Sequence, residues 1–311
     1  MIEQICCVCH KPVGPDAPRL GGRYYCETHY AKVAQDRRSV WASGVVQIVG
    51  VLVFVGLVAL IVSRTKLVLD GAALVWAGIV LALIPALLWL GFFYQQDRLE
   101  PEPKGFVLAV FLLGGLLASA AGIPLVRDLF QVQAWMSRSA AANILGNILI
   151  IGFVQEFLKY AAVRYSVYLS PEFDERIDGV IYGTAAGLGF ATMLNIHYVT
   201  ANAGVDLGVG VVRIAVTALA QASFAGVSGY FLGRAKFEEE PVWWLPLGVT
   251  IAAVLNGLFT YVRGEIVTVG LRYRPVNGLV LATAVALAAF ALLYYLMRRA
   301  NRLTLAAGSA G

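Results

Sequence analysis

Eight long apolar runs constrain the fold of this chain more than any other feature of its sequence. Each run is close to the roughly 20 residues that cross the hydrocarbon core of a bilayer as an α-helix. The runs are Gly44–Ser63, Ala72–Tyr94, Gly105–Val126, Ala140–Val163, Ile177–Val199, Leu207–Leu232, Val242–Val262 and Leu279–Met297. None sustains the apolar and polar alternation of a transmembrane β-barrel strand. The sequence therefore predicts an all-α, polytopic membrane bundle of about eight transmembrane helices.

Composition excludes a soluble globular chain. Hydrophobic residues make up 59% of the sequence and charged residues only 14%, and the mean hydropathy is +0.74. In a soluble domain about a quarter of the residues are charged. The net charge of +5 comes from Lys and Arg scattered over the connections between runs. Because they form no basic patch, we expect the lipid bilayer as a partner and no nucleic acid.

An even number of spans places both chain ends on one side of the membrane. If that side is the cytoplasm, twelve basic residues flank the spans inside and seven outside, as the positive-inside rule favours. The inner residues are Lys32, Arg37, Arg38, Arg98, Lys104, Arg164, Arg176, Arg234, Lys236, Arg298, Arg299 and Arg302, and the outer ones are Arg64, Lys66, Arg127, Arg138, Arg263, Arg272 and Arg274. Residues 1–40 lack the apolar core of a secretory signal. We expect an integral cell-membrane protein with cytoplasmic N- and C-termini.

Small residues recur at a spacing of four in two of the runs. Gly179, Gly183 and Gly187 lie in the fifth run, and Gly229 and Gly233 in the sixth. Residues four apart share one face of a helix, and glycine there lets two backbones approach closely in lipid. We therefore expect the fifth and sixth helices to lie at the centre of the bundle.

Four metal-type ligands lie in two pairs near the N-terminus. Cys6 and Cys9 are separated by two residues, as are Cys26 and His29, with sixteen residues between the pairs. This spacing is typical of a tetrahedral structural zinc site. A segment of forty residues cannot build a large core, so the metal would supply much of its folding free energy. The alternative is a set of reduced structural cysteines without metal.

The predicted zinc module resembles half of a LIM-type or treble-clef finger over about forty residues. Cys7 is then a spare thiol, and His10 lies outside the site. A closed site with four protein ligands leaves no open position for a substrate. The module is therefore expected to be structural. We divide the chain into this module (residues 1–40), a helical membrane domain (41–300) and a flexible tail (301–311).

Ionisable residues within a span are costly, and each is a candidate for function. Gln155, Glu156 and Lys159 lie in the fourth run, where the three-residue spacing places Glu156 and Lys159 on one helix face. They could form a buried structural ion pair or part of a catalytic site. His197 is the one histidine of the membrane part, and it is read either as a core or rim residue or as a substitute ligand.

From about Asp97 to Tyr261 the chain resembles the PrsW family of intramembrane proteases, distant relatives of the CAAX-processing membrane peptidases. The motifs that carry the resemblance are Asp97–Pro103, Gln155–Lys159, Asp178–Gly183, Gly189–Ala191 and Gly229–Gly233. The resemblance implies a membrane peptidase whose glutamates and histidines ready a water molecule, directly or with a metal.

The chain departs from that family pattern at most of the positions that the resemblance makes catalytic. Glu156 and Lys159 are retained, followed later by the family-like Asn195. The pattern has glutamate where this chain has Gln155 and Leu194, and histidine where it has Gln221 and Asn256. Amides still form hydrogen bonds, but they neither accept a proton near neutral pH nor bind transition metals well.

The leading functional hypothesis is a catalytically inactive protease homologue that binds membrane-anchored proteins or transmembrane segments, with a protein partner for the zinc module. No metal is expected in the membrane domain. One alternative is an active intramembrane endopeptidase that uses Glu156 with non-standard partners such as His197. Another is a membrane transporter or channel, since polar groups at mid-membrane also serve ion paths. Whether the chain is an enzyme is left open by its sequence.

Overall fold

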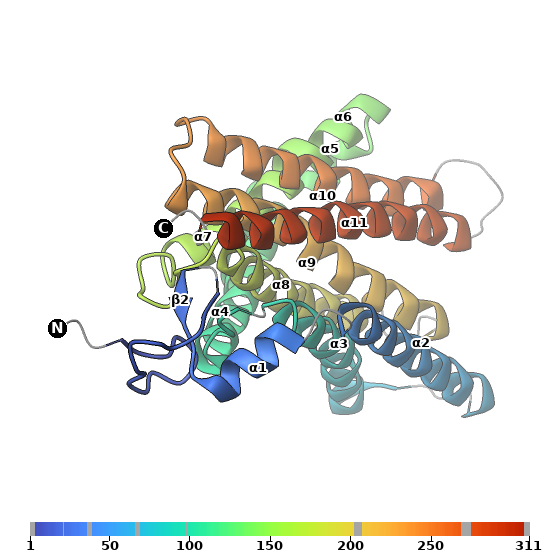
Figure 1. The fold of residues 1–311 in the computed structure, drawn as a ribbon. Coiled ribbons are helices and arrows are strands. Elements are labelled where there is room, and N and C mark those ends of the chain that lie inside the picture. The colour runs from blue at the N-terminus through green and yellow to red at the C-terminus, as the bar shows by residue number, and fades with distance from the viewer. Residues whose placement is uncertain are drawn as a thin grey trace.

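The N-terminal module and the helical bundle are separate parts of the fold (Figure 1). The structure is a computed structural model that describes residues 4–20, 22–35, 39–65, 69–97, 99–201, 207–268 and 275–307. The module has a short antiparallel hairpin of β1 (Arg19–Leu20) and β2 (Arg23–Tyr24), followed by helix α1 (Glu27–Gln35).

The bundle consists of long α-helices with π-helical segments in the third and fourth spans. Its elements are α2 (Ser39–Thr65), α3 (Gly71–Tyr94), α4 (Lys104–Leu117), η1 (Ala118–Gly122), η2 (Leu125–Leu129), α5 (Val132–Met136), α6 (Ala140–Leu145), η3 (Gly146–Gly152), α7 (Phe153–Arg164), α8 (Asp178–Ala201), α9 (Leu207–Phe237), α10 (Trp244–Thr268) and α11 (Pro275–Ala307). In the described part of the chain, eight helical segments are long and apolar enough to cross a membrane. The predicted polytopic helical membrane fold is thus confirmed.

Helices α8 and α9 form the centre of the bundle. Their most apolar windows are 83% and 89% buried, whereas that of α2 is not buried at all. Gly179 and Gly183 of α8 lie directly against the backbone of Gly229 and Ala225 on α9. A side chain at Gly183 would come within 2.6 Å of the Ala225 carbonyl oxygen. The glycine spacing therefore marks the central helix pair, as expected from the sequence.

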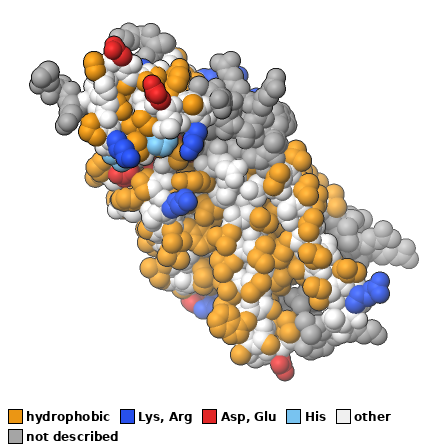
Figure 2. Space-filling view, turned by 60° about the horizontal axis from the view of Figure 1, so that its bottom comes forward, with side chains coloured by type: hydrophobic (Ala, Val, Ile, Leu, Met, Phe, Trp, Pro, Cys, Tyr) orange, Lys and Arg blue, Asp and Glu red, His pale blue; other side chains and the backbone are white. Residues whose placement is uncertain are grey.

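The outer surface of the bundle is apolar. Val46, Leu52 and Trp76 are all more than 60% exposed. Figure 2 shows hydrophobic side chains over most of one face of the helical body, with charged side chains mainly towards its ends. Such a large exposed apolar surface indicates contact with lipid.

Two boundaries differ from those expected. Helix α11 continues to Ala307, so residues 301–307 of the predicted tail are helical, while 308–311 lie outside the described residues. Leu, Ala and Arg in this segment favour helix, which explains the extension. The third span runs from Lys104 to Met136 through its π-helical segments, well beyond Val126. Arg37, Arg38, Lys66, Arg98, Arg272 and Arg274, which entered the charge count, lie outside the described residues.

Hairpin β1–β2 docks on the helical bundle. The Tyr25 side chain is fully buried, and its hydroxyl donates a hydrogen bond to the Leu99 carbonyl oxygen at 3.0 Å. Arg23 pairs with three carboxylates of the bundle, at 3.0 Å from both Glu100 and Asp174 and in direct contact with Glu175. The module is therefore attached to the loop after α3 and to the loop before α8.

Candidate functional site in the helical bundle

A fully connected polar cluster lies inside the bundle where α7, α9 and α10 meet. Gln155, Glu156 and Lys159 come from α7, Gln221 from α9 and Asn256 from α10. All five side chains are buried, and Glu156 and Asn256 have no exposed surface. Residues far apart in the sequence thus form one group, which we call the α7–α9–α10 network.

Direct hydrogen bonds join all five side chains. Nζ of Lys159 lies 2.5 Å from Oε1 of Glu156 and also donates to Oε1 of Gln221. Nδ2 of Asn256 donates to Oε1 of Glu156 at 2.7 Å and to Oε1 of Gln155 at 3.1 Å. Nε2 of Gln221 donates to Oδ1 of Asn256 at 3.1 Å. The amides therefore serve the carboxylate and the ammonium as donors and acceptors.

Small residues bring the three helices close enough for these bonds. A side chain at Gly257 would come within 2.5 Å of the Ile148 backbone, and one at Gly152 would overlap the Ala253 carbonyl. The close contact of η3 with α10 therefore places Asn256 beside Glu156. On α8, Gly187 lies directly against the Gln221 carbonyl. Glycine at these contacts fixes the spacing of the network.

The network has little capacity for acid–base chemistry. It contains one carboxylate, Glu156, whose Oε1 is already bound to Lys159 and Asn256. Oε2 of Glu156 is buried and has no hydrogen-bond partner. The remaining three members are amides, which do not titrate near neutral pH. Oε2 of Glu156 is therefore the only carboxylate oxygen of this network that is free to accept a hydrogen bond from water.

Three sequence candidates lie apart from the network. Asn195 of α8 is buried, and its Nδ2 donates to the Ile214 carbonyl oxygen at 3.1 Å. Leu194, its neighbour, is partly exposed and apolar. His197 is exposed near the end of α8, so it is a rim histidine and does not contribute a ligand beside Glu156.

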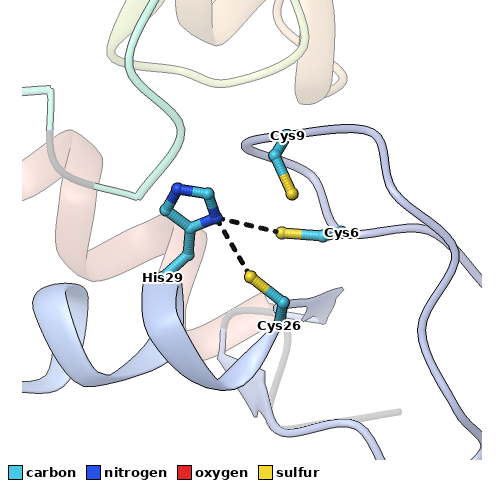
Figure 3. A group of neighbouring side chains, drawn as sticks. All are labelled: Cys6, Cys9, Cys26 and His29. Carbon is cyan, nitrogen blue, oxygen red and sulfur yellow. Dashed lines mark hydrogen bonds between the residues drawn. The ribbon is translucent and has the colours of Figure 1, made fainter.

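The four N-terminal metal-type ligands come together in the module. Sγ of Cys6, Cys9 and Cys26 and a ring nitrogen of His29 all lie within 4.8 Å of one another. Nδ1 of His29 is 3.1 Å from Sγ of Cys26 and 3.6 Å from Sγ of Cys6, and Cys9 points to the same place (Figure 3). Three sulfurs and one imidazole nitrogen around one point are a suitable donor set for a soft or borderline metal ion.

Neighbouring groups distinguish Cys26 from Cys7. A hydrogen bond from Thr28 lowers the pKa of Cys26 to about 6, which favours its thiolate. Burial raises the pKa of Cys7 to about 12. His10 is exposed and its φ of 53° turns the chain back at this point. The structure thus places Cys7 and His10 outside the four-ligand cluster.

The sequence analysis names Asp97–Pro103 and Asp178–Gly183 as family motifs but does not predict that three of their acids meet. The carboxylates of Asp97, Glu102 and Asp178 are buried, with one oxygen of each within 4.8 Å of the others. Asp97 and Glu102 flank the connection from α3 to α4, and Asp178 begins α8. Acidic residues directly after one span and directly before another were the available signal. The expectation of no metal in the membrane domain did not take this group into account.

Comparison with known proteins places the chain in a family. A family model described as PrsW family intramembrane metalloprotease matches residues 102–291, which is more than half of the chain. The chain belongs to the PrsW family. Three relatives named Protease PrsW are similar to it: those of Halalkalibacterium halodurans (33% identical; 57% of this chain and 79% of the relative), Geobacillus kaustophilus (34%; 57% and 75%) and Bacillus subtilis (31%; 61% and 82%). No solved structure is a significant match.

The PrsW family description implies a metal ion, so the network was tested for its ability to hold one. Around Glu156 the donors are one carboxylate and three neutral amides, and the Lys159 ammonium lies 2.5 Å from that carboxylate. Amides are poor ligands for transition metals, so Glu156 is the one strong donor for such an ion among these five residues. The residues of the α7–α9–α10 network in this PrsW-family chain therefore do not fit a metal ion.

Proposed function

We propose that this chain is a PrsW-family protein that has lost peptidase activity and binds transmembrane segments of membrane-anchored proteins. The single observation that carries the proposal is the hydrogen-bonded set of Gln155, Gln221 and Asn256 around the Glu156–Lys159 pair. A hydrolytic site needs a group that accepts a proton from water and a group that stabilises the oxyanion. Here the one carboxylate is paired, and its neighbours are neutral amides.

Retention of a polar network supports a binding role. Buried amides in lipid are costly unless each finds a partner, and an apolar core would avoid that cost. Helix α7 carries the network on one face and exposes Phe157, at 53%, on another. Within the proposal, a transmembrane segment packs beside α7, next to the former catalytic centre of the family.

The N-terminal module is proposed to hold one structural zinc ion through Cys6, Cys9, Cys26 and His29, and both chain ends to face the cytoplasm. The four ligand atoms form a closed set with no open position. Free thiols, as in this module, are typical of the cytoplasm. A membrane-impermeant thiol reagent should label an Asp16→Cys variant, changed at an exposed position, above the wild-type level only after cell lysis, and such labelling in intact cells would refute this orientation.

Cleavage and binding are tested on the purified full chain in detergent with a reporter that has one transmembrane segment. We expect no cleavage above the level of the Glu156→Gln variant. A photocrosslinker in place of Phe157 should capture the reporter, while one in place of Leu57 on α2, which is equally exposed at 54%, should not. Cleavage that disappears in Glu156→Gln would overturn the loss of activity, and equal capture at both positions would overturn the binding role.

One observation favours a second candidate, an active endopeptidase that uses Glu156. Its Oε2 atom is buried without a hydrogen-bond partner, so it is the one acceptor of the network that a water molecule could use. This candidate predicts reporter cleavage that Glu156→Gln abolishes and His197→Ala, a change at the exposed rim, leaves intact.

A further inference from the structure

The carboxylates of Asp97, Glu102 and Asp178 are held in place by donors from the surrounding backbone and from Tyr182. Oδ2 of Asp97 accepts a hydrogen bond from the Glu102 amide at 2.9 Å. Oδ2 of Asp178 accepts from the amides of Asp174 at 2.7 Å and Glu175 at 2.5 Å. Oε2 of Glu102 accepts from the Tyr182 hydroxyl at 2.5 Å. Each acid is thus fixed through one of its oxygens.

The opposite oxygens of the two aspartates lack an N–H or hydroxyl donor. Oδ1 of Asp97 and Oδ1 of Asp178 are both buried and receive no hydrogen bond from a backbone or side-chain N–H or hydroxyl group, although the carboxyl groups of Asp178 and Glu102 are close enough to share a proton. The two side chains are 97% or more buried. Buried polar atoms in folded proteins almost always have a partner, and an unsatisfied charged oxygen is especially costly. Two such atoms beside a third carboxylate indicate that a ligand belongs between them.

The nearby basic residues are already engaged. Arg23 pairs with Glu100, Asp174 and Glu175. Nζ of Lys236 donates to the backbone carbonyls of Tyr168 and Phe173. Among the residues that the structure describes, no Lys or Arg side chain pairs with Asp97, Glu102 or Asp178. Within the described residues, Arg23 and Lys236 act on these three carboxylates only at a distance, so protons or a bound cation would supply the direct counter-charge.

We propose that Asp97, Glu102 and Asp178 bind a hard divalent cation, with Ca²⁺ as the best match. All of the available ligand atoms are carboxylate oxygens. Ca²⁺ prefers oxygen ligands, whereas softer ions such as zinc also bind nitrogen and sulfur. Bound there, the ion ties the α3–α4 connection to the first turn of α8. It gives this chain a second metal site, separate from the Cys and His cluster and from the α7–α9–α10 network.

Burial and geometry also explain why the ion competes with protons. Burial, together with the neighbouring Asp178, raises the pKa of Asp97 well above its ordinary range and that of Glu102 to about 10. Protons and a cation would therefore compete for the same carboxylate oxygens. A cation that takes the place of those protons binds more tightly as the pH rises.

Terbium luminescence tests the site, because Tb³⁺ takes the place of Ca²⁺ at oxygen sites and the Tyr182 ring beside Glu102 can sensitise it. The full chain in detergent, with its module saturated with zinc, is titrated with Tb³⁺ and then with Ca²⁺. We expect a saturable tyrosine-sensitised signal that Ca²⁺ displaces. Asp97→Asn and Glu102→Gln should each weaken binding by about tenfold or more, because affinity follows the number of charged ligands.

Matched variants separate this site from unspecific binding by acidic residues. Glu172→Gln, just before α8, and Asp128→Asn, an exposed acid paired with Arg127, should keep the full signal. The melting temperature of the wild-type chain should also rise in Ca²⁺. This measurement uses no variant, so it does not depend on whether a variant folds. Absence of a saturable signal at pH 8 would overturn the proposal, and equal affinity in Asp97→Asn and Asp128→Asn would overturn it by showing that the ion binds elsewhere.

Discussion

Nζ of Lys159 lies 2.5 Å from Oε1 of Glu156, and both side chains are fully buried in the centre of the bundle. The two residues are three positions apart on α7, so their contact is local. The side chains around the pair come from other helices as well. Gln221 and Asn256 arrive from α9 and α10 and bind the ammonium and the carboxylate, respectively. Neutral amides from three helices therefore surround the buried ion pair.

Removal of one member of this pair should destabilise the bundle. Lys159→Met leaves the buried Glu156 carboxylate without its cation, at an expected cost of about 3–5 kcal/mol in the free energy of unfolding. The change is measured by thermal or denaturant unfolding in detergent. The double variant Glu156→Gln/Lys159→Met, which removes both charges, should recover much of the loss. Equal instability of the double and single variants would contradict the ion-pair interpretation.

Replacement of the amides should create a metal site in the helical domain. The triple variant Gln155→Glu, Gln221→His and Asn256→His supplies the ligand types that the family pattern implies, at positions already in contact. Zinc content, measured by elemental analysis, should rise from about one to about two ions per chain. Asn195→His is the matched control, because this buried amide of α8 lies apart from the network. A rise in zinc content in both the triple variant and Asn195→His would argue against a metal site built from the α7–α9–α10 network.

The module cysteines should differ sharply in their effect on zinc content. Cys26→Ser removes one of four ligands and should release the zinc ion, because the closed site supplies much of the module's folding free energy. Cys7→Ser changes a thiol outside the cluster and should retain the metal. Zinc content after dialysis measures both. Loss of zinc in Cys7→Ser alone would reverse the assignment of the ligands.

Arg23 should hold the module on the bundle. Arg23→Gln leaves Glu175, which is 2% exposed, without its cation and weakens the contact between β2 and the two loops. Amide hydrogen exchange at 99–102 and 172–178 should become faster, because the docked surface opens more often. Arg19→Gln, which removes a cation stacked 4.2 Å from the Tyr24 ring inside the module, should leave exchange in those loops unchanged.

The acidic group should make stability depend on pH. Burial and the charges of Asp178 and Asp97 raise the pKa of Glu102 from 4.5 to about 10, opposed by the Tyr182 hydroxyl, and Lys236 interacts electrostatically with Glu102. The folded chain then binds a proton that the unfolded chain releases. Without added divalent ions, the free energy of unfolding should therefore fall as pH rises from about 4.5 to about 10.

Two further measurements test whether Glu102 causes this pH dependence of stability. Glu102→Gln cannot titrate and should show a shallower fall over the same pH range. Added Ca²⁺ should reduce the fall in the wild-type chain more strongly at high pH than at low pH. If the free energy of unfolding instead rises between about pH 4.5 and about pH 10, the carboxylates are ionised in the folded chain and other groups already balance their charge.

Much of the architecture is readable from local sequence. Apolar runs of about 20 residues predict the spans, because lipid requires each span to satisfy its own backbone hydrogen bonds. The four-residue spacing of Gly179, Gly183 and Gly187 predicts the central helix because all three lie on one face. The paired spacing of Cys6 with Cys9 and of Cys26 with His29 predicts the module for the same local reason.

What the chain alone determined is therefore the number of spans, the central helix pair and the metal-type ligand pairs, all of which depend on residues only a few positions apart. Only the tertiary structure decided that Gln221 and Asn256 enclose the Glu156–Lys159 pair while Asn195 does not. It alone also joined Asp97 with Asp178 and Arg23 with Glu175. These contacts depend on how whole helices pack, which no short-range pattern encodes.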